Sequence, residues 1–238
     1  MKKDEVTSPT IHLESVILSM VIDKHERRDV ATFDVAGAFL ITDIDSFILI
    51  KLDGDMVDIM CDANNSYKTY VTYEYGKRVL YTRLLKSLYS IIQTALLWYR
   101  TFVKYLKADG FKINKYDPCI TNKIVNGKQC TVYWHVDDTK ISHVDKNVVG
   151  AVIKNIENEF GTMTVTTGKE HNFVGMNTQL KDDGTVSITM KDYIEEYITS
   201  YGEEVRNNST MSPTNNKLFN VDVHSNKLSQ DKSDIFIT

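Results

Sequence analysis

Apolar residues recur at helical spacing in four segments of the chain. The longest segment is 84–109, where apolar side chains step by three and four residues until Gly110, a residue type that commonly follows the end of a helix. The same spacing predicts helices over residues 11–27, 145–160 and 192–201. The chain is therefore expected to contain these four helices, of which the one over 84–109 is the most regular, and a further short helix around residues 57–61 after the turn at Gly54.

Short apolar runs bounded by turn residues predict β-strands between these helices. The predicted strands lie in residues 31–40, 47–52, 120–125, 130–136, 139–144, 162–166, 172–180 and 186–190. The first of these segments is expected to pass from a buried strand into a turn or the start of a helix. Asn126-Gly127 is a strong hairpin signal between two of them, and Asp137-Asp138 occupies the tight turn between the next two. Helices mixed with consecutive hairpins predict an α+β fold with an antiparallel sheet.

The composition is that of an ordinary globular protein, with 238 residues of which 42% are hydrophobic and 25% charged. No apolar run approaches the roughly 18 residues that a membrane span requires, so we expect an intracellular protein without a membrane partner. The three cysteines are odd in number and far apart, which predicts reduced thiols and neither a disulfide framework nor a zinc knuckle.

The formal net charge of −4 conceals an uneven distribution. Ten basic and only two acidic residues lie between Lys68 and Lys115, interleaved with tyrosine and tryptophan. One interpretation is a surface that faces the phosphates and bases of a nucleic acid. The other is a solvated helix face whose lysine stems cover the core, and the segment alone does not separate the two.

Three aspartates carry the main candidate chemistry. Asp137 and Asp138 stand side by side in a hairpin turn, where aspartate is common for purely structural reasons. Asp34, however, lies inside the apolar run FDVAGAFL, where an unpaired buried charge is costly. Carboxylates that converge in this way are tolerated when divalent cations neutralise them, and Mg²⁺ prefers such oxygen ligands together with phosphates.

Two other chemistries are weaker. His135, His143 and Asp138 provide ligands of the zinc type, but no fourth ligand is evident. Ser87, Ser90 and Cys119 lack an identifiable base or a nucleophile elbow, which argues against hydrolase chemistry.

Six motifs occur in an order that resembles the reverse transcriptase domain of copia-type long-terminal-repeat retrotransposon polyproteins. They are FDVAGAFL, LLKSLYSIIQTALLWY, YDPCITNK, YWHVDDTKIS, FVGM and SPT, spread over about residues 30–213. The resemblance implies a right-hand polymerase palm with partial fingers and the start of a thumb or connection. It divides the chain into an N-terminal helix with partial fingers (1–29), a palm with inserted fingers elements (30–201) and a polar tail or linker (202–238) toward a missing connection and ribonuclease H region.

The resemblance also implies an activity and its residues. The function would be RNA-directed DNA synthesis, in which two Mg²⁺ ions, or Mn²⁺ as a substitute, support transfer of a nucleotide from a dNTP to a primer 3′-hydroxyl. The catalytic and metal-binding residues would be Asp34, Asp137 and Asp138. The nucleotide site would include the Val35 carbonyl, Phe39 beneath the deoxyribose, and Gln93 near the template. The alternative for Phe39 is a core phenylalanine that points the other way, and the alternative for Gln93 is a polar residue on a helix face.

The implied partners are an RNA or DNA template with its primer, dNTPs, and the ribonuclease H and integrase parts of the Pol polyprotein, in a cytoplasmic virus-like particle with a nuclear phase. The chain departs from the family where His135 replaces tyrosine, and where the usual Gly, Lys, Pro and Arg are replaced by Ser90, Ile92, Ala95 and Leu96. Arg83 and Lys86 remain as basic candidates for phosphate contact. The alternative function is a catalytically inactive, degenerate nucleic-acid-binding remnant of such an element.

Overall fold

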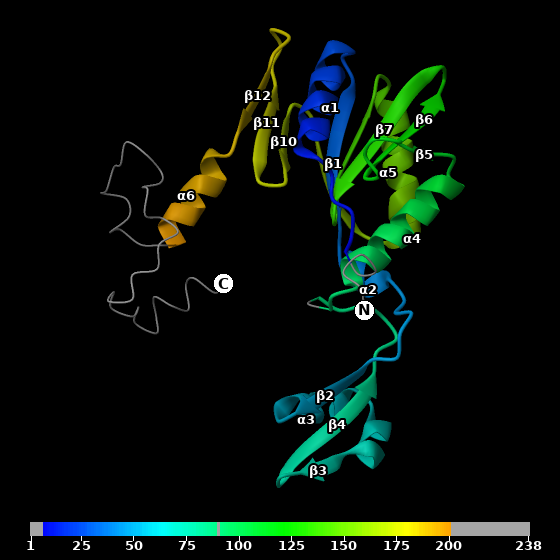
Figure 1. Ribbon diagram of the computed structural model, residues 1–238, viewed down its shortest axis with the longest axis vertical. Helices are drawn as coiled ribbons and strands as arrows, with labels where there is room; N and C mark the ends of the chain where they lie inside the picture. The colour runs from blue at the N-terminus through cyan, green and yellow to red at the C-terminus, as the bar shows by residue number, and fades with distance from the viewer. Residues whose placement is uncertain (1–6, 90, 201–238) are drawn as a thin grey trace.

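A computed structural model describes residues 7–89 and 91–200, and it is built around three antiparallel sheets. The largest sheet has six strands in the order β5-β6-β7-β8-β1-β9 (Figure 1). Its strands are β1 (Asp29–Val35), β5 (Lys112–Ile113), β6 (Ile120–Val125), β7 (Lys128–His135), β8 (Asp138–His143) and β9 (Met163–Thr167). The expected α+β class with antiparallel strands is confirmed.

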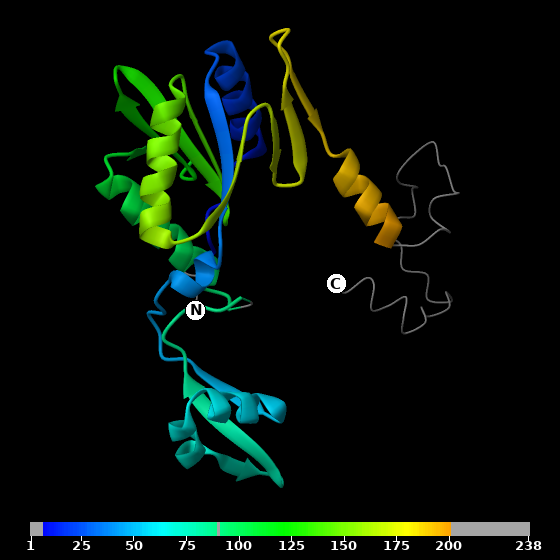
Figure 2. The same ribbon diagram turned by 180° about the vertical axis from the view of Figure 1, so that it is seen from behind.

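Helices α4 (Thr94–Ala108) and α5 (Lys146–Phe160) pack together on one face of the large sheet (Figure 2). Trp98 and Phe102 of α4 stack at 5.3 Å between ring centroids, and both contact Phe160 of α5. Trp134 of β7 meets Phe102 edge-on at 5.3 Å. Alternate residues of β1, β7 and β8, such as Phe33, Trp134 and Ile141, point toward the two helices, so this face holds a large part of the hydrophobic core.

Helix α1 (Leu13–His25) lies against the opposite face of the large sheet. Its Asp23 forms a buried ion pair with Lys140 of β8, and its Met20 sulfur accepts a hydrogen bond from Thr178 of β11. The second sheet, β10-β11-β12, lies beside α1 (Figures 1 and 2). It consists of β10 (Glu170–Phe173), β11 (Met176–Leu180) and β12 (Val186–Thr189), followed by α6 (Lys191–Ser200).

The third sheet, β2-β4-β3, stands apart from the other two at the lower end of Figure 1. Its elements are α2 (Ala38–Ile41) on the approach, β2 (Leu49–Asp53), α3 (Asp55–Ala63), the 3₁₀ helix η2 (Asn65–Tyr70), β3 (Thr72–Glu74) and β4 (Lys77–Arg83). Val57, Cys61 and Leu80 form a small core of their own there. This unit therefore has its own packing and is inserted between β1 and α4 in the chain.

Two predicted elements are wrong in extent. The helix expected over 84–109 begins only at Thr94, because the preceding residues run along the loop after α2, where Ser87 N–H bonds to the Thr42 carbonyl. The strand expected over 172–180 is a hairpin, with Val174 and Gly175 at φ +51° and +71° in the turn between β10 and β11. Strands β3, β4 and β5 were not predicted. The tail expected over 202–238 lies outside the described residues.

Across the described ranges, no helix has both the length and the apolar character that a membrane crossing needs.

Candidate functional site

Asp34 sits near the end of β1, a strand flanked on both sides by β8 and β9 in the large sheet. Its neighbours Phe33 and Val35 are buried toward the helices, with exposed fractions of 3% and 1%. Because successive strand residues alternate between faces, Asp34 points to the opposite face, where it is half-buried. Phe33 and Val35 on either side of this carboxylate thus belong to the core, and the carboxylate itself does not.

The structure brings the three predicted aspartates to one end of the sheet. Asp34 is directly opposite Asp138 in the β1–β8 register, and directly opposite pairs on one face have Cβ atoms about 4.5–5.5 Å apart. Asp138 also pairs with His135 across the β7–β8 hairpin, whose two turn residues are Val136 and Asp137. All three aspartates and His135 are half-buried.

The carboxylates act on one another electrostatically. Burial raises the pKa of Asp34, and the negative charges of Asp137 and Asp138 raise it further. Burial also raises the pKa of Asp138, as does the charge of Asp137, while a hydrogen bond from the Val174 backbone N–H and the proximity of His135 oppose that rise. Burial and mutual repulsion thus both act against the ionised forms of Asp34 and Asp138.

Two contacts that the sequence pattern did not reveal hold this hairpin from opposite sides. The Val174 N–H, from the turn between β10 and β11, donates to the Asp138 carboxylate. On the core side, the Trp98 indole N–H donates to the Val136 carbonyl at 2.9 Å. Gly175 was the sequence signal available for the first contact. Trp98 was counted only among the aromatic residues of the basic stretch, as a candidate to face bases, whereas the structure buries it to 1% exposure.

The donor set suits a hard divalent cation, since it consists of carboxylate oxygens in an excess of negative charge. Within residues 7–89 and 91–200, however, no group of three or more His, Cys, Asp or Glu side chains is close enough to hold a metal ion. Metal binding by these aspartates therefore requires their side chains to move closer together.

The zinc alternative is wrong for this arrangement. His143 is 1% exposed, and its ring nitrogens lie 3.3 Å from the backbone oxygens of Val125 and Asp145. His143 is the last residue of β8, at the opposite end of the strand from Asp138. Its Nδ1 accepts a hydrogen bond from the Asp145 N–H at 3.0 Å, in the loop before α5.

The predicted nucleotide-site residues lie around the short helix α2. Phe39 is half-buried on α2, and its ring meets Tyr89 edge-on with the centroids 4.9 Å apart. Gln93 accepts a hydrogen bond from the Ser46 hydroxyl at 3.2 Å. Val35 is the last residue of β1, beside Asp34. Tyr89, which is 56% exposed, is the aromatic residue of this group that the sequence did not single out.

The two basic candidates differ in their contacts. Lys86 forms an ion pair with Asp43 at 2.6 Å and donates to the Ile41 carbonyl at 2.9 Å. Arg83, at the end of β4, lies 5.1 Å above the ring of Phe47, which is 68% exposed. Lys86 thus secures the loop after α2, whereas Arg83 forms an exposed cation–π pair at the base of the small sheet.

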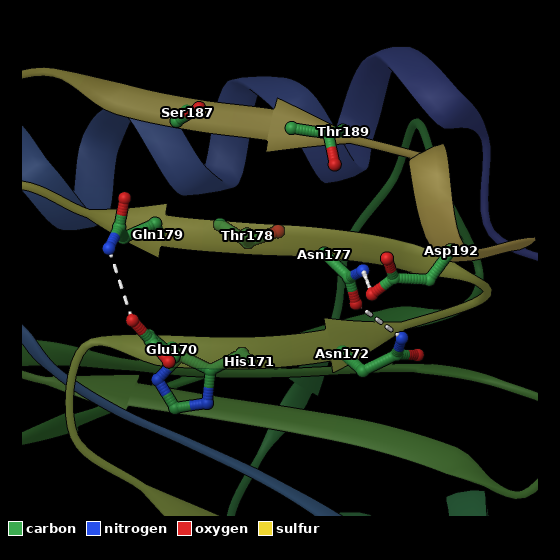
Figure 3. A pocket seen from close by; sticks show the side chains of 9 residues that line it. All are labelled: Glu170, His171, Asn172, Asn177, Thr178, Gln179, Ser187, Thr189 and Asp192. Atoms are coloured by element: carbon green, nitrogen blue, oxygen red, sulfur yellow. Dashed lines mark hydrogen bonds between the residues drawn. The ribbon is translucent and has the colours of Figure 1, made fainter.

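A polar cavity of about 440 Å³ lies over the β10-β11-β12 sheet, away from the predicted site residues. Figure 3 shows Asn172, Asn177 and Asp192 gathered at one end, joined by hydrogen bonds of 2.7 and 2.6 Å. Glu170 and Gln179 form a further hydrogen bond of 3.1 Å at the other end. The residues that line this cavity include none of the three predicted aspartates.

The raised pKa of Asp138 leads to a prediction for stability. A carboxyl whose folded-state pKa exceeds its unfolded value stabilises the fold while protonated, and this contribution is lost as the pH rises through the folded pKa. At pH 7 the ionised group therefore destabilises the metal-free protein. Asp138→Asn keeps an acceptor for Val174, and we expect it to raise the Tm by a few degrees at pH 7 in EDTA.

Circular dichroism melts at several pH values provide the test, and the gain should vanish near the ordinary aspartate pKa of 3.8. Asp183→Asn is the matched control. A hydrogen bond from Thr185 lowers the pKa of Asp183, so its stabilising contribution is present at neutral pH and is lost on acidification. That variant should not be stabilised at pH 7; stabilisation of both variants alike would contradict the prediction.

Comparisons with known proteins agree with the motif order. The family model described as reverse transcriptase (RNA-dependent DNA polymerase) matches residues 1–216. The retrovirus-related Pol polyprotein from transposon TNT 1-94 of Nicotiana tabacum is 21% identical over 200 residues, which are 83% of this chain and 14% of that protein. This chain thus spans only a small part of that relative's length.

A solved structure of telomerase from Candida albicans, in complex with a fragment of telomeric RNA, superposes with a TM-score of 0.38 and 11% identity. It covers 80% of this chain and 39% of the telomerase chain. The family match, in contrast, extends over all of the described residues and includes all three aspartates. The chain therefore belongs to the reverse transcriptase (RNA-dependent DNA polymerase) family.

Proposed function

We propose that this chain is the RNA-directed DNA polymerase part of a retrotransposon Pol polyprotein. The observation that carries the proposal is the pairing of Asp34 with Asp138 across two neighbouring strands, with Asp137 in the adjoining turn. Three carboxylates gathered at one sheet end are costly unless they bind cations, and a module that only bound nucleic acid would gain nothing from them.

The architecture supports a division into polymerase subdomains. The six-stranded sheet with α4 and α5 on its far face corresponds to a palm, because its other face presents the carboxylates. The β2-β4-β3 unit, inserted between Asp34 and α4, corresponds to part of the fingers. Helix α6, which follows the β10-β11-β12 sheet, corresponds to the start of a thumb or connection.

Asp34, Asp137 and Asp138, with the Val35 carbonyl, would hold two Mg²⁺ or Mn²⁺ ions together with the triphosphate of a dNTP. When bound, such ions stabilise the charge that develops as a primer 3′-hydroxyl displaces pyrophosphate from the α-phosphate. The contribution of the chain is to fix the carboxylates on the ends of paired strands. Paired strands suit this role because they fix the backbone that carries the carboxylates, so that only the side chains have to move to bind the ions.

Phe39 and Tyr89 would form one wall of the nucleotide site. Their edge-to-face contact limits the movement of the Phe39 ring. A deoxyribose would fit beside the ring, whereas the 2′-hydroxyl of a ribose would clash with it. Gln93 would lie nearby toward the template, held by Ser46.

Phe39→Val tests this wall. We expect the smaller side chain to admit ribonucleotides, so that the preference for dTTP over UTP falls about tenfold or more while kcat for dTTP changes little. Steady-state incorporation on poly(rA)/oligo(dT) measures the ratio. Phe47→Val, which alters an exposed aromatic on the small sheet, is the control and should keep the preference. If Phe39→Val keeps the wild-type preference for dTTP over UTP, the sugar of the nucleotide does not contact Phe39.

The second candidate function is nucleic-acid binding without catalysis. The observation that favours it is the surface of the small sheet and η2, where Tyr70, Tyr73 and Tyr75 are 68%, 72% and 102% exposed beside the basic strand β4. Exposed aromatics next to cationic side chains are suited to stacking bases along a charged groove. That surface requires none of the three aspartates.

Template-directed incorporation separates the two functions. A heteropolymeric RNA template with a labelled DNA primer is incubated with one dNTP at a time, in Mg²⁺, in Mn²⁺ and in EDTA. A polymerase adds only the complementary nucleotide, and only with a divalent cation. If the protein shifts the mobility of the primer–template but adds no nucleotide, the result supports nucleic-acid binding without catalysis and rejects the polymerase function.

A further inference from the structure

The turn that carries the paired aspartates has a strained backbone. Val136 has φ +58°, a conformation that β-branched residues rarely adopt. Such strain persists only where surrounding contacts hold the chain in place. The Val136 carbonyl is part of the peptide bond that leads into Asp137, so whatever fixes this carbonyl also fixes the start of Asp137.

Trp98 is the side chain that contacts this carbonyl from the core. Its indole N–H donates to the Val136 oxygen at 2.9 Å, and the residue is only 1% exposed. Its ring stacks on Phe102 at 5.3 Å and meets Phe160 edge-on at 5.2 Å. The donor is therefore held by both core helices, and it cannot follow the turn if the turn moves.

We propose that Trp98 is a positioning residue, which sets the orientation of the turn that carries Asp137 and Asp138 by hydrogen-bonding to the Val136 carbonyl. It touches neither substrate nor metal, and it acts through the turn. The proposed effect on metal binding rests on the proposed function, whereas the effect on the turn itself does not. Helix α4 thereby links the packing of the core to the placement of the carboxylates.

Trp134 provides a matched control. It is also 1% exposed, packs against the same Phe102, and lies in the same core. Its indole nitrogen, however, has no hydrogen-bond partner among the described residues. A Trp→Phe change at either position removes a similar volume from the core, but only the change at Trp98 removes a hydrogen bond to the turn.

The experiment compares Trp98→Phe with Trp134→Phe by two measurements. The first, in EDTA, is the ¹H–¹⁵N NMR spectrum of the Val136, Asp137 and Asp138 amides, which we expect to shift and broaden in Trp98→Phe and to stay close to wild type in Trp134→Phe. The second is a Mn²⁺ titration of the same proteins followed by electron paramagnetic resonance. We expect about three- to tenfold weaker Mn²⁺ binding in Trp98→Phe, as for the loss of one hydrogen bond.

The two measurements have distinct outcomes. Equal effects of the two variants on the turn amides would overturn the proposal, because core packing alone would then account for them. If wild type takes up no Mn²⁺, the metal site of the proposed function fails, and the amide signals still decide the role of Trp98. Should Trp98→Phe fail to fold, 3-benzothienylalanine at position 98 keeps the ring shape without the N–H, and the same spectral changes are expected.

Discussion

Asp34→Asn is expected to lower the rate of primer extension about a thousandfold or more, which corresponds to about 4 kcal/mol of transition-state stabilisation. Asparagine has nearly the shape of aspartate, so the strand and its pairing with Asp138 should be preserved. What is lost is one of the negative charges that hold the divalent cations. Single-turnover extension at saturating dNTP, in Mg²⁺ and in Mn²⁺, measures the effect.

Asp29→Asn is the control on the same strand, since Asp29 begins β1 opposite His143 and takes no part in the carboxylate group. It should extend primers at the wild-type rate. Thermal unfolding should show that Asp34→Asn is folded and no less stable than wild type at pH 7, because the pKa of Asp34 is raised by burial and by its acidic neighbours. Extension by Asp34→Asn at the wild-type rate would remove Asp34 from the catalytic group.

The second large effect concerns stability. Lys140 pairs with Asp23 beneath the sheet, and their side chains are 4% and 1% exposed. Burial lowers the pKa of Lys140, whereas the charge of Asp23 raises it. Arg28 lies 4.0 Å from Asp23. Lys140→Met leaves Asp23 charged and buried with only this distant partner, so we expect a loss of about 3–5 kcal/mol in the free energy of unfolding.

Urea unfolding measures that loss, and a double variant tests its cause. Lys140→Met combined with Asp23→Leu replaces the whole pair with apolar groups and should recover most of the stability. Lys51→Met, which breaks the exposed pair with Glu74 at 2.5 Å, should cost far less. If the losses in unfolding free energy from Lys140→Met and Asp23→Leu simply add in the double variant, the ion pair between α1 and β8 is not the cause of the loss.

The sequence pattern predicted best where local signals and tertiary structure agree. The hairpin turn at Asn126-Gly127 was placed correctly, whereas the next turn lies one residue earlier than predicted, at Val136-Asp137, because Asp138 already pairs with His135. The start of α5 is also local, because the Asp145 side chain accepts from the Asn147 N–H at 2.9 Å. Asp34 stood out for a physical reason, namely a charge within an apolar run.

The start of α4 was missed because apolar spacing alone cannot distinguish a helix from a loop. Leu85 and Ile92 continue the helical spacing, yet they are 68% and 77% exposed. This segment pairs instead with the loop after α2, where Lys86 forms a bridge with Asp43. Such pairing between distant segments leaves no trace in a short sequence window.

The hairpin between β10 and β11 was missed for a different reason. Val174 adopts a left-handed conformation that valine rarely takes, so the residue preference pointed to a continuous strand. Only Gly175 signalled the turn, and a Cβ at Gly175 would lie 3.3 Å from the Tyr193 ring. The hydrogen bond from the Val174 N–H to Asp138 therefore could not be predicted from the sequence.

The central claim is that Asp34, Asp137 and Asp138 act together in metal-dependent DNA synthesis. The most direct measurement is extension of oligo(dT) on poly(rA) with dTTP by wild type and by Asp137→Asn, in Mg²⁺ and in Mn²⁺. We expect a ladder of added nucleotides with wild type, none in EDTA, and a loss of at least about a thousandfold in the variant. Tight binding of the primer–template by wild type without any extension, in either metal, would contradict it.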